Sequence, residues 1–341
     1  MTLTYRSRRR LRKAGKVLGT LLLASIVIWF CWFLWLERFV VYSADGAQLR
    51  LDEPYAFEGG VVAVPPEKVT VSIHYNEGDD KVNTSSELGQ ISGYYASTSL
   101  LLDSVEKVDQ AIQALPPGSA VVLDLKSIYG NFYYNTEIPG APVADALDAS
   151  QVDTLIKHLV ASDYYLIARV PAFRDRAYGL ENTQYGLPVS AGYLWYDDEN
   201  CYWLNPTSNG ALSYLIAIAT ELRELGFDEV LFHEFRFPDT DSIIINSDLS
   251  REEAIALAAE KVVSSCATEQ FAVSFETDDE GFSLPEGRSR LYLTDVSAAQ
   301  AQAVLDASTV PVKESQLVFF TETNDTRFDI ASVIRTLTVS D

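Results

Sequence analysis

The sequence predicts an α/β protein built as a (β/α)8, TIM-like barrel, complete or degenerate, behind an N-terminal transmembrane helix. From residue 90 onward, short apolar runs typical of strands alternate with amphipathic stretches typical of helices, the pattern of parallel βαβ units. This region spans about 250 residues and contains seven strand-like runs, which fits a barrel better than a doubly wound sheet. Neither common type of glycine-rich phosphate loop is present in the sequence, which disfavours a nucleotide-binding fold.

The N-terminus has the charge pattern of a membrane anchor. Residues 1–16 carry seven basic side chains and no acid, and residues 17–36 carry no charge at all. Twenty apolar residues can cross a hydrocarbon core of about 30 Å. Tryptophans gather at the far end of the span, where their rings favour the interface: Trp29, Trp32 and Trp35. We therefore expect a single-pass cell-membrane protein with a cytoplasmic N-terminus and an extracytoplasmic domain after Glu37.

A cleaved signal peptide is the alternative interpretation of this segment. The apolar core of a signal peptide runs for about 7–15 residues and leads to a site with small residues. Here the apolar run is longer, and the sequence Val41-Tyr42-Ser43-Ala44 is a poor cleavage site. An uncleaved anchor is therefore favoured.

Charge and cysteine content exclude several classes of partner and site. The formal net charge is −22, and removing the seven positive charges of the tail leaves −29 for the rest. So acidic a domain is not expected to bind nucleic acid or an anionic membrane surface. Cys201 and Cys266 could pair in an oxidising compartment, but two isolated thiols are favoured, and Cys31 lies in the predicted span. Cysteine spacing and the three histidines indicate no metal site, and no cofactor is expected.

Residues 37–88 form a connector, and residues 89–341 form the predicted barrel domain. Residues 69–75 of the connector alternate like a strand. The seven strands of the barrel are expected at residues 91–96, 120–126, 165–170, 226–238, 271–276, 290–295 and 316–321. Helices are expected at residues 100–115, 152–161, 211–225, 251–266, 297–308 and near 327–337. The eighth strand comes from residues 67–75, or the barrel is degenerate.

An ordered series of short motifs resembles a known family. The motifs are Gly93-Tyr94-Tyr95, Val122-Leu123-Asp124-Leu125-Lys126, Ile167-Ala168-Arg169-Val170, Phe173-Arg174-Asp175, Trp203-Leu204-Asn205-Pro206, Gly226-Phe227-Asp228-Glu229 and Arg236-Phe237-Pro238. Together they resemble a bacterial glycoside-hydrolase domain family related to the α-amylase-like TIM barrels. The resemblance covers residues 90–240 well and residues 270–324 loosely. It implies a (β/α)8 barrel, a carbohydrate ligand and placement at the cell surface.

Two positions depart from the family pattern. The central strand of the family is similar to Phe-Asp-Tyr-x-Arg-Phe-Pro, with Asp as the expected catalytic carboxylate. This chain has His233 at the Asp position and Glu234 at the Tyr position. The second strand usually reads Asp-x-Lys-Asp in the family, and here Ser127 replaces the second acid. The missing Asp counts against catalysis.

Three acids at predicted strand ends are the candidate catalytic residues, namely Glu276, Asp124 and Glu234. Glycoside hydrolysis needs two carboxyl groups about 5–5.5 Å apart for retention or about 6.5–9.5 Å apart for inversion. The resemblance places the fold's acid at Glu276, although Glu276 also opens an acidic run that reads as a solvated loop. Because strand side chains alternate, Glu234 is expected to point away from His233 and to pair with Arg236, unless a bend before Pro238 turns it back.

The candidate substrate-binding residues are charged or aromatic side chains near strand ends and in the long 178–203 excursion, namely Lys126, Arg169, Trp195, Tyr196, His233 and Arg236. Asp124 and Lys126 are two positions apart on one predicted strand, so their side chains should point to the same face. They could bind sugar hydroxyl groups at the mouth or form an internal ion pair, and the sequence favours neither. Long loops tend to be functional, and Trp195 and Tyr196 contact ligand or pack the loop onto the barrel.

The sequence is compatible with three functions. The first is a membrane-anchored barrel that binds cell-envelope or external carbohydrate without hydrolysing it. The alternatives are an active glycosidase, with Glu276 as acid and Asp124 or Glu234 as its partner, and a non-catalytic surface scaffold. The loss of one of two essential carboxylates favours the barrel that binds carbohydrate without hydrolysing it.

Overall fold

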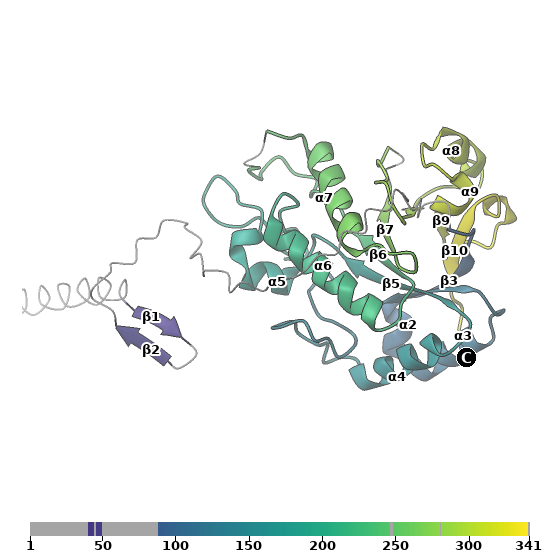
Figure 1. Ribbon diagram of the computed structural model, residues 1–341, viewed down its shortest axis with the longest axis horizontal. Coiled ribbons are helices and arrows are strands. Elements are labelled where there is room, and N and C mark those ends of the chain that lie inside the picture. Colours follow the sequence, from purple (N-terminus) through teal and green to yellow (C-terminus); the bar gives the residue numbers. More distant parts are fainter. Residues whose placement is uncertain (1–39, 44–45, 50–87, 246–247, 280, 340–341) are drawn as a thin grey trace, which may run out of the picture. The chain divides into compact units, whose positions relative to one another are not determined.

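The computed structural model describes residues 40–43, 46–49, 88–245, 248–279 and 281–339 (Figure 1). The predicted basic tail and transmembrane span, at residues 1–36, and the strand predicted at residues 69–75 lie outside this part. Within it, no helix is both long and apolar enough to cross a membrane. The chain divides into two units, residues 1–78 and 79–341. In the first unit, β1 (Val40–Ser43) and β2 (Gly46–Leu49) pair as antiparallel strands.

The second unit is a closed barrel of eight parallel strands in the order β10-β3-β4-β5-β6-β7-β8-β9. All seven predicted strands are present, as β3 (Ser92–Ala96), β4 (Ala120–Asp124), β5 (Tyr165–Pro171), β6 (Glu229–His233), β7 (Ala272–Thr277), β8 (Leu291–Leu293) and β9 (Leu317–Thr321). Closure by parallel strands with intervening helices confirms the TIM-like barrel.

The eighth strand is β10 (Ser332–Thr336), where the sequence pattern predicted a terminal helix. That prediction was wrong. A single 3₁₀ turn, η3 (Thr326–Phe328), precedes an extended segment that pairs with β9 on one side and with β3 on the other. Val333 and Ile334 are both buried: Val333 packs outside the barrel against the surrounding helices, and Ile334 packs inside the barrel. A short run that is apolar on both faces does not distinguish strand from helix by periodicity.

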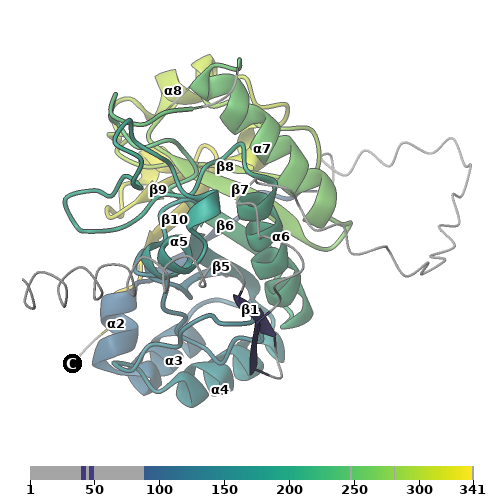
Figure 2. The same cartoon turned by 90° about the vertical axis from the view of Figure 1, so that its left-hand side faces the viewer.

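Helices pack around the outside of the strands (Figures 1 and 2). They are α2 (Thr98–Asp103), α3 (Val105–Gln113), α4 (Ala149–Val160), α5 (Arg176–Glu181), α6 (Asn209–Glu224), α7 (Arg251–Cys266), α8 (Ala301–Ala307) and α9 (Lys313–Gln316), with a 3₁₀ turn η2 (Thr183–Tyr185). Helix α7 begins at a capping box between Ser250 and Glu253. Among the described residues that connect β7 to β8, no helix is present, so the barrel is irregular on that side.

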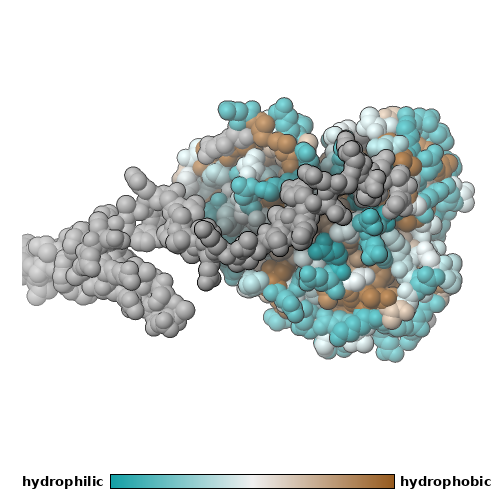
Figure 3. Space-filling view, in the orientation of Figure 1, coloured by the Kyte–Doolittle hydropathy of each residue, from teal (hydrophilic) through white to brown (hydrophobic). Residues whose placement is uncertain are grey.

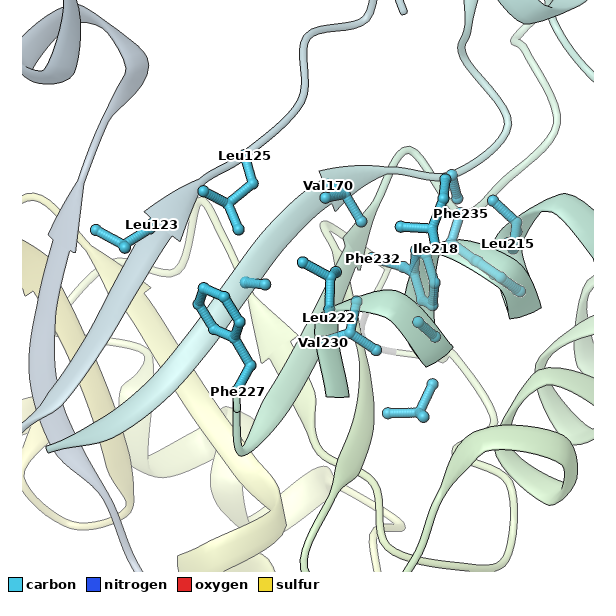
Figure 4. Packing of buried hydrophobic residues seen from close by; sticks show 14 of the residues in the cluster. Leu123, Leu125, Val170, Leu215, Ile218, Leu222, Phe227, Val230, Phe232 and Phe235 are labelled. Carbon is cyan, nitrogen blue, oxygen red and sulfur yellow. The ribbon is translucent and has the colours of Figure 1, made fainter. Parts of the chain in front are cut away.

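Two apolar layers hold the barrel together. Between strands and helices, Phe227, Val230 and Phe232 pack against side chains of α6 (Figure 4). Inside the barrel, a separate layer alternates with these along the strands and comprises Ala120, Val122, Ile167, Leu231, Tyr292, Val318 and Ile334. The alternation fixes which polar residues point into the barrel at either end.

A buried ion pair closes the amino-terminal end of the barrel. Glu229 accepts hydrogen bonds from Tyr165 Oη at 2.9 Å and Tyr292 Oη at 2.8 Å, and it pairs with Arg290. Arg290 Nη2 also donates to the carbonyl of Gly89 at 3.0 Å, and its Nε donates to the carbonyl of Ser315 at 2.9 Å. These partners satisfy groups that would be costly to bury alone.

Cys201 and Cys266 are free, buried thiols, and Cys31 lies outside the described residues. Burial raises the pKa of each thiol to about 11. Both thiols are therefore protonated and unreactive at neutral pH.

Candidate functional site at the barrel mouth

Polar side chains gather where five neighbouring strands end. Tyr95, Asp124, Arg169, His233 and Glu276 come from β3, β4, β5, β6 and β7, at or near the carboxyl end of each. Arg169 pairs with both Asp124 and Glu276, and Tyr95 donates a hydrogen bond to Asp124. This end of a (β/α)8 barrel is where such folds build their sites.

Arg169 bridges two of the candidate acids. Its Nη1 donates to Asp124 Oδ1 at 2.9 Å, while its Nε and Nη2 donate to Glu276 Oε2 at 2.6 Å and Oε1 at 2.7 Å. The rigid guanidinium holds the bonded carboxylate oxygens at most about 8 Å apart. The two acids are thus close enough for a two-carboxylate mechanism, but an arginine lies between them.

Asp124 has little remaining capacity to bind a ligand. It is only 7 % exposed. Its second oxygen accepts from Tyr95 Oη at 2.6 Å, from Thr98 Oγ1 at 2.9 Å and from the Thr98 amide at 3.1 Å. Burial, and then the nearby Asp124 carboxylate, raises the pKa of Tyr95 well above its usual value, so the phenol stays a donor. Asp124 therefore holds the side chains of Tyr95, Thr98 and Arg169 in place, and little of its own surface is open to a ligand.

His233 reaches the mouth from β6 as a neutral imidazole. Burial, together with the positive charges of Arg169, Lys126 and Arg174, lowers its pKa well below the ordinary 6.5. A neutral imidazole offers one donor and one acceptor, which suits hydroxyl groups.

Glu234 interrupts the alternation of β6. Its φ of 51° lies in the left-handed region, which a side chain other than glycine seldom adopts. The carboxylate pairs with Arg174 Nη1 at 3.2 Å and Arg236 Nη2 at 2.9 Å, as expected for Arg236. The backbone turn nevertheless brings Glu234 to the same pocket as His233 and Glu276.

Two adjoining pockets, here called the mouth pockets, open above these residues. The larger has a volume of about 360 Å³ and is lined by Tyr95, Phe320, Glu322 and Thr336, among others. The smaller, of about 190 Å³, is lined by His233, Glu234 and Arg236, among others. Both share four lining residues: Arg169, Glu276, Thr294 and Asp295. The larger lies within the range of about 300–1,000 Å³ typical of small-ligand sites.

Lys126 lies away from the mouth. Beyond the end of β4 its side chain no longer follows the strand parity, and it is completely buried beside the rings of Phe132 and Tyr214. Its Nζ pairs with Asp175 Oδ2 at 2.6 Å, and Asp175 also caps α5. The geometry is that of an internal ion pair, and a role for Lys126 in ligand binding stays a prediction.

The predicted aromatic contacts also lie outside the mouth pockets. Trp195 packs beside Trp203, with ring centroids 6.3 Å apart, and Tyr196 is half exposed on a bridge to Tyr202. Neither lines either mouth pocket. Arg236 lines the smaller pocket and lies over the Trp203 ring at 5.1 Å. The structure thus brings Arg169, His233, Glu234, Arg236 and Glu276 together, with Asp124 beneath them.

Several mouth residues were not anticipated from the sequence. Asp295 follows β8, lines both mouth pockets and is exposed, again with a left-handed φ of 58°. Thr336 and Phe320 come from β10 and β9. The available signal for Asp295 was its place as the last residue of the strand predicted at 290–295. Thr336 could not be anticipated, because the strand that contains it was predicted as a helix. Among the residues described, no group of three or more His, Cys, Asp or Glu side chains is arranged to hold a metal ion.

A closed parallel barrel with polar residues at the carboxyl ends of its strands is the architecture of TIM-barrel enzymes and their relatives. A family model described as "Putative glycosyl hydrolase domain" matches residues 97–272, just over half of the chain. The chain therefore belongs to this family of glycoside-hydrolase-like domains. No curated protein matches the chain in sequence.

Solved structures share the fold. A GH36 alpha-galactosidase from Geobacillus stearothermophilus, in complex with stachyose, is 11 % identical with a TM-score of 0.51. The match covers 74 % of this chain and 39 % of the galactosidase, so the chain spans about two fifths of that enzyme. A hypothetical protein from Ruminiclostridium thermocellum is 23 % identical with a TM-score of 0.46, covering 53 % of this chain and 96 % of the other. At such identities the galactosidase match shows the barrel fold alone.

Proposed function

We propose that this protein is a membrane-anchored, extracytoplasmic barrel that binds cell-envelope or external carbohydrate at its mouth and does not hydrolyse it. The family and the barrel support a carbohydrate ligand. The basic tail and apolar span in the sequence support the anchor. The observation that carries the lack of hydrolysis is the Arg169 bridge between Asp124 and Glu276.

A glycosidase needs one carboxyl group that enters the reaction protonated and a second that acts as nucleophile or base. The Arg169 guanidinium bonds to Asp124 on one side and to Glu276 on the other, so it occupies the space between the two carboxylates where a glycosidic bond would have to lie. Both oxygens of Glu276 are bonded to Arg169, and Asp124 is enclosed by four donors. His233 lies at the position where the sequence resemblance implies a catalytic Asp, and it supplies no carboxylate. These groups are arranged to bind hydroxyl groups.

Binding is tested with a pair of variants at the eighth strand. Thr336 is exposed and lines the larger mouth pocket, while Thr338 is exposed two residues later and lines neither mouth pocket. Thr336→Trp should fill the pocket and abolish binding in calorimetric titrations with neutral oligosaccharides, and Thr338→Trp should leave binding intact. Equal binding by both variants, or no binding of any glycan by the unaltered protein, would contradict the proposal.

Active hydrolysis is the second candidate, because Glu234 and Glu276 line the same 190 Å³ pocket. Prolonged incubation with the glycans that bind, followed by chromatography of the products, distinguishes the two. Cleavage that disappears in Glu276→Gln would establish a glycosidase and contradict the proposal that the protein binds carbohydrate without hydrolysing it. Anchoring is tested separately, since an anchored protein stays with the membrane fraction after alkaline carbonate washing.

A further inference from the structure

A third pocket, here called the side cleft, lies between the start of α7 and the connection from β7 to β8. Its volume is about 340 Å³. Its apolar lining comes mainly from Phe237, Ile255 and Phe282. Its charged lining comprises Arg236, Asp239, Arg251, Glu252, Asp278 and Asp279. An apolar floor with a polar rim is typical of a ligand site.

The side cleft adjoins the mouth. It shares Phe235, Arg236, Thr277 and Asp278 with the smaller mouth pocket, which in turn shares four residues with the larger one. The three pockets therefore adjoin in series from Thr336 and Glu322, past Glu276, to α7, and this series is here called the groove. A ligand that reaches from one end to the other has to be a chain.

The walls of the side cleft are fixed in place. Arg251 donates to the carbonyls of Pro238 at 3.2 Å and Thr240 at 2.6 Å, and it lies over the ring of Phe237 at 5.9 Å. Phe282 packs against Phe275 of β7, with ring centroids 5.4 Å apart. A preformed apolar surface binds without the cost of ordering it first.

We propose that the side cleft is a second subsite for the glycan bound at the mouth, so that the protein takes a neutral oligosaccharide chain rather than a single sugar. This inference rests on the proposed function. Sugar rings carry apolar C–H faces beside their hydroxyl groups, and the cleft presents Phe237, Ile255 and Phe282 beside charged hydrogen-bonding groups. The ring at the mouth meets mainly polar groups, whereas a distal ring meets an apolar floor.

The charge of the groove defines the class of glycan. The mouth pockets are lined by Glu234, Glu276, Asp278, Asp295 and Glu322 against two arginines and a neutral His233. In the side cleft, four acids face Arg236 and Arg251. Arg169 and Arg236 are already paired with carboxylates. Negative potential along the whole groove repels uronic, sulfated or phosphorylated chains. On the face seen in Figure 3, hydrophilic residues lie beside several apolar patches.

Adjacent residues of α7 offer a matched pair of variants. Ala256 lines the side cleft and is partly buried, whereas Leu257 is 52 % exposed and does not line it. Arginine is a good helix former at either position. Ala256→Arg fills the cleft, and Leu257→Arg adds the same charge to the same helix outside it. Neither change touches the residues that meet at Arg169.

Affinities are measured by calorimetry with malto-, cello- and N-acetylchito-oligosaccharide ladders from disaccharide to heptasaccharide, and with polygalacturonate. In the ladder that binds, affinity should rise with length and then level off. Ala256→Arg should lower the affinity for the longest chain about tenfold, as expected for the loss of one buried apolar contact. The affinity for the disaccharide should not change. Leu257→Arg should change neither, and polygalacturonate should not bind.

Other outcomes overturn the inference in distinguishable ways. The second subsite would be refuted if disaccharide and heptasaccharide bound at the mouth with equal affinity and Ala256→Arg changed neither affinity. The proposed function would then still stand. Tight binding of polygalacturonate would refute the neutral class. Absence of binding by every ladder would refute both the inference and the proposed function.

Discussion

Arg169 and Glu276 form a two-bond contact at the mouth, with Nε and Nη2 each donating to a different oxygen of the same carboxylate. The same guanidinium lies 5.5 Å from the ring of Tyr95 and bonds to Asp124. A forked contact of this kind fixes geometry as well as charge. Arg169 therefore organises the mouth, and the inferences about ligand binding depend on it.

Replacing Arg169 with Met should destabilise the fold by about 3–5 kcal/mol, because two carboxylates with little exposure lose the charge between them. Urea denaturation at neutral pH measures the change. Arg236→Met is the control, since the Arg236 side chain is 49 % exposed and solvent screens its ion pair. A stability equal to that of the unaltered protein would show that Asp124 and Glu276 do not need the bridge.

His233 should make stability depend on pH between about 7 and 5. The pKa of His233 is lowered in the folded state, so below its ordinary pKa the unfolded chain binds a proton that the folded chain does not. Stability should then fall with falling pH, by up to about 1.4 kcal/mol per pH unit from this residue.

His233→Gln should remove this share of the slope. The comparison is made by urea denaturation of both proteins at several pH values. His158→Gln is the control, because His158 is exposed and pairs with Asp109 on the surface. Parallel slopes for the unaltered protein and His233→Gln would mean that His233 is readily protonated in the fold.

Glu234 tests the cost of its left-handed backbone. Glu234→Ala and Glu234→Gly both remove the ion pairs with Arg174 and Arg236, but only glycine adopts a φ of 51° without strain. The glycine variant should therefore be more stable than the alanine variant by about 1 kcal/mol. Thermal or urea denaturation of the two variants measures this difference, and a less stable glycine variant would argue against strain at this position.

Glu229 should be essential for stability and irrelevant to binding. Its side chain is completely buried with Arg290 at the end of the barrel opposite the mouth. Glu229→Gln should cost about 3–5 kcal/mol, because it leaves the arginine charge uncompensated. Asp325→Asn, at an exposed ion pair with Arg327, should change little. Glycan affinity of folded Glu229→Gln should equal that of the unaltered protein, and a large loss of affinity would contradict the separation of the two ends.

Periodicity and strand ends were enough to predict most of the barrel. Seven strands carry apolar runs bounded by turn residues, and their order in the sequence predicts that Asp124, Arg169, His233 and Glu276 lie at one end of the sheet. The eighth strand could not be predicted, because Ser332–Thr336 is short and its only apolar residues, Val333 and Ile334, are adjacent and face opposite sides of the sheet. Its neighbours β9 and β3 decide its conformation, and that information is not local.

The site was less predictable than the fold because its side chains depart from strand geometry. Glu234 and Asp295 reach the mouth through left-handed residues, which alternation does not anticipate. Lys126 leaves it because β4 ends two residues earlier, at Asp124. Contacts such as the Arg169 bridge join residues more than forty positions apart, so only the closed barrel brings them together.

The hydrogen bond from Arg290 to the Gly89 carbonyl has a mechanical consequence. Gly89 lies three residues before β3, the first barrel strand, and Arg290 also bonds to Glu229 and to the carbonyl of Ser315. Tension on the chain before Gly89 would therefore be shared among three segments of the barrel. Strand β3 pairs in parallel with β4 on one side and β10 on the other. Pulling it out would require the hydrogen bonds to both neighbours to break at the same time.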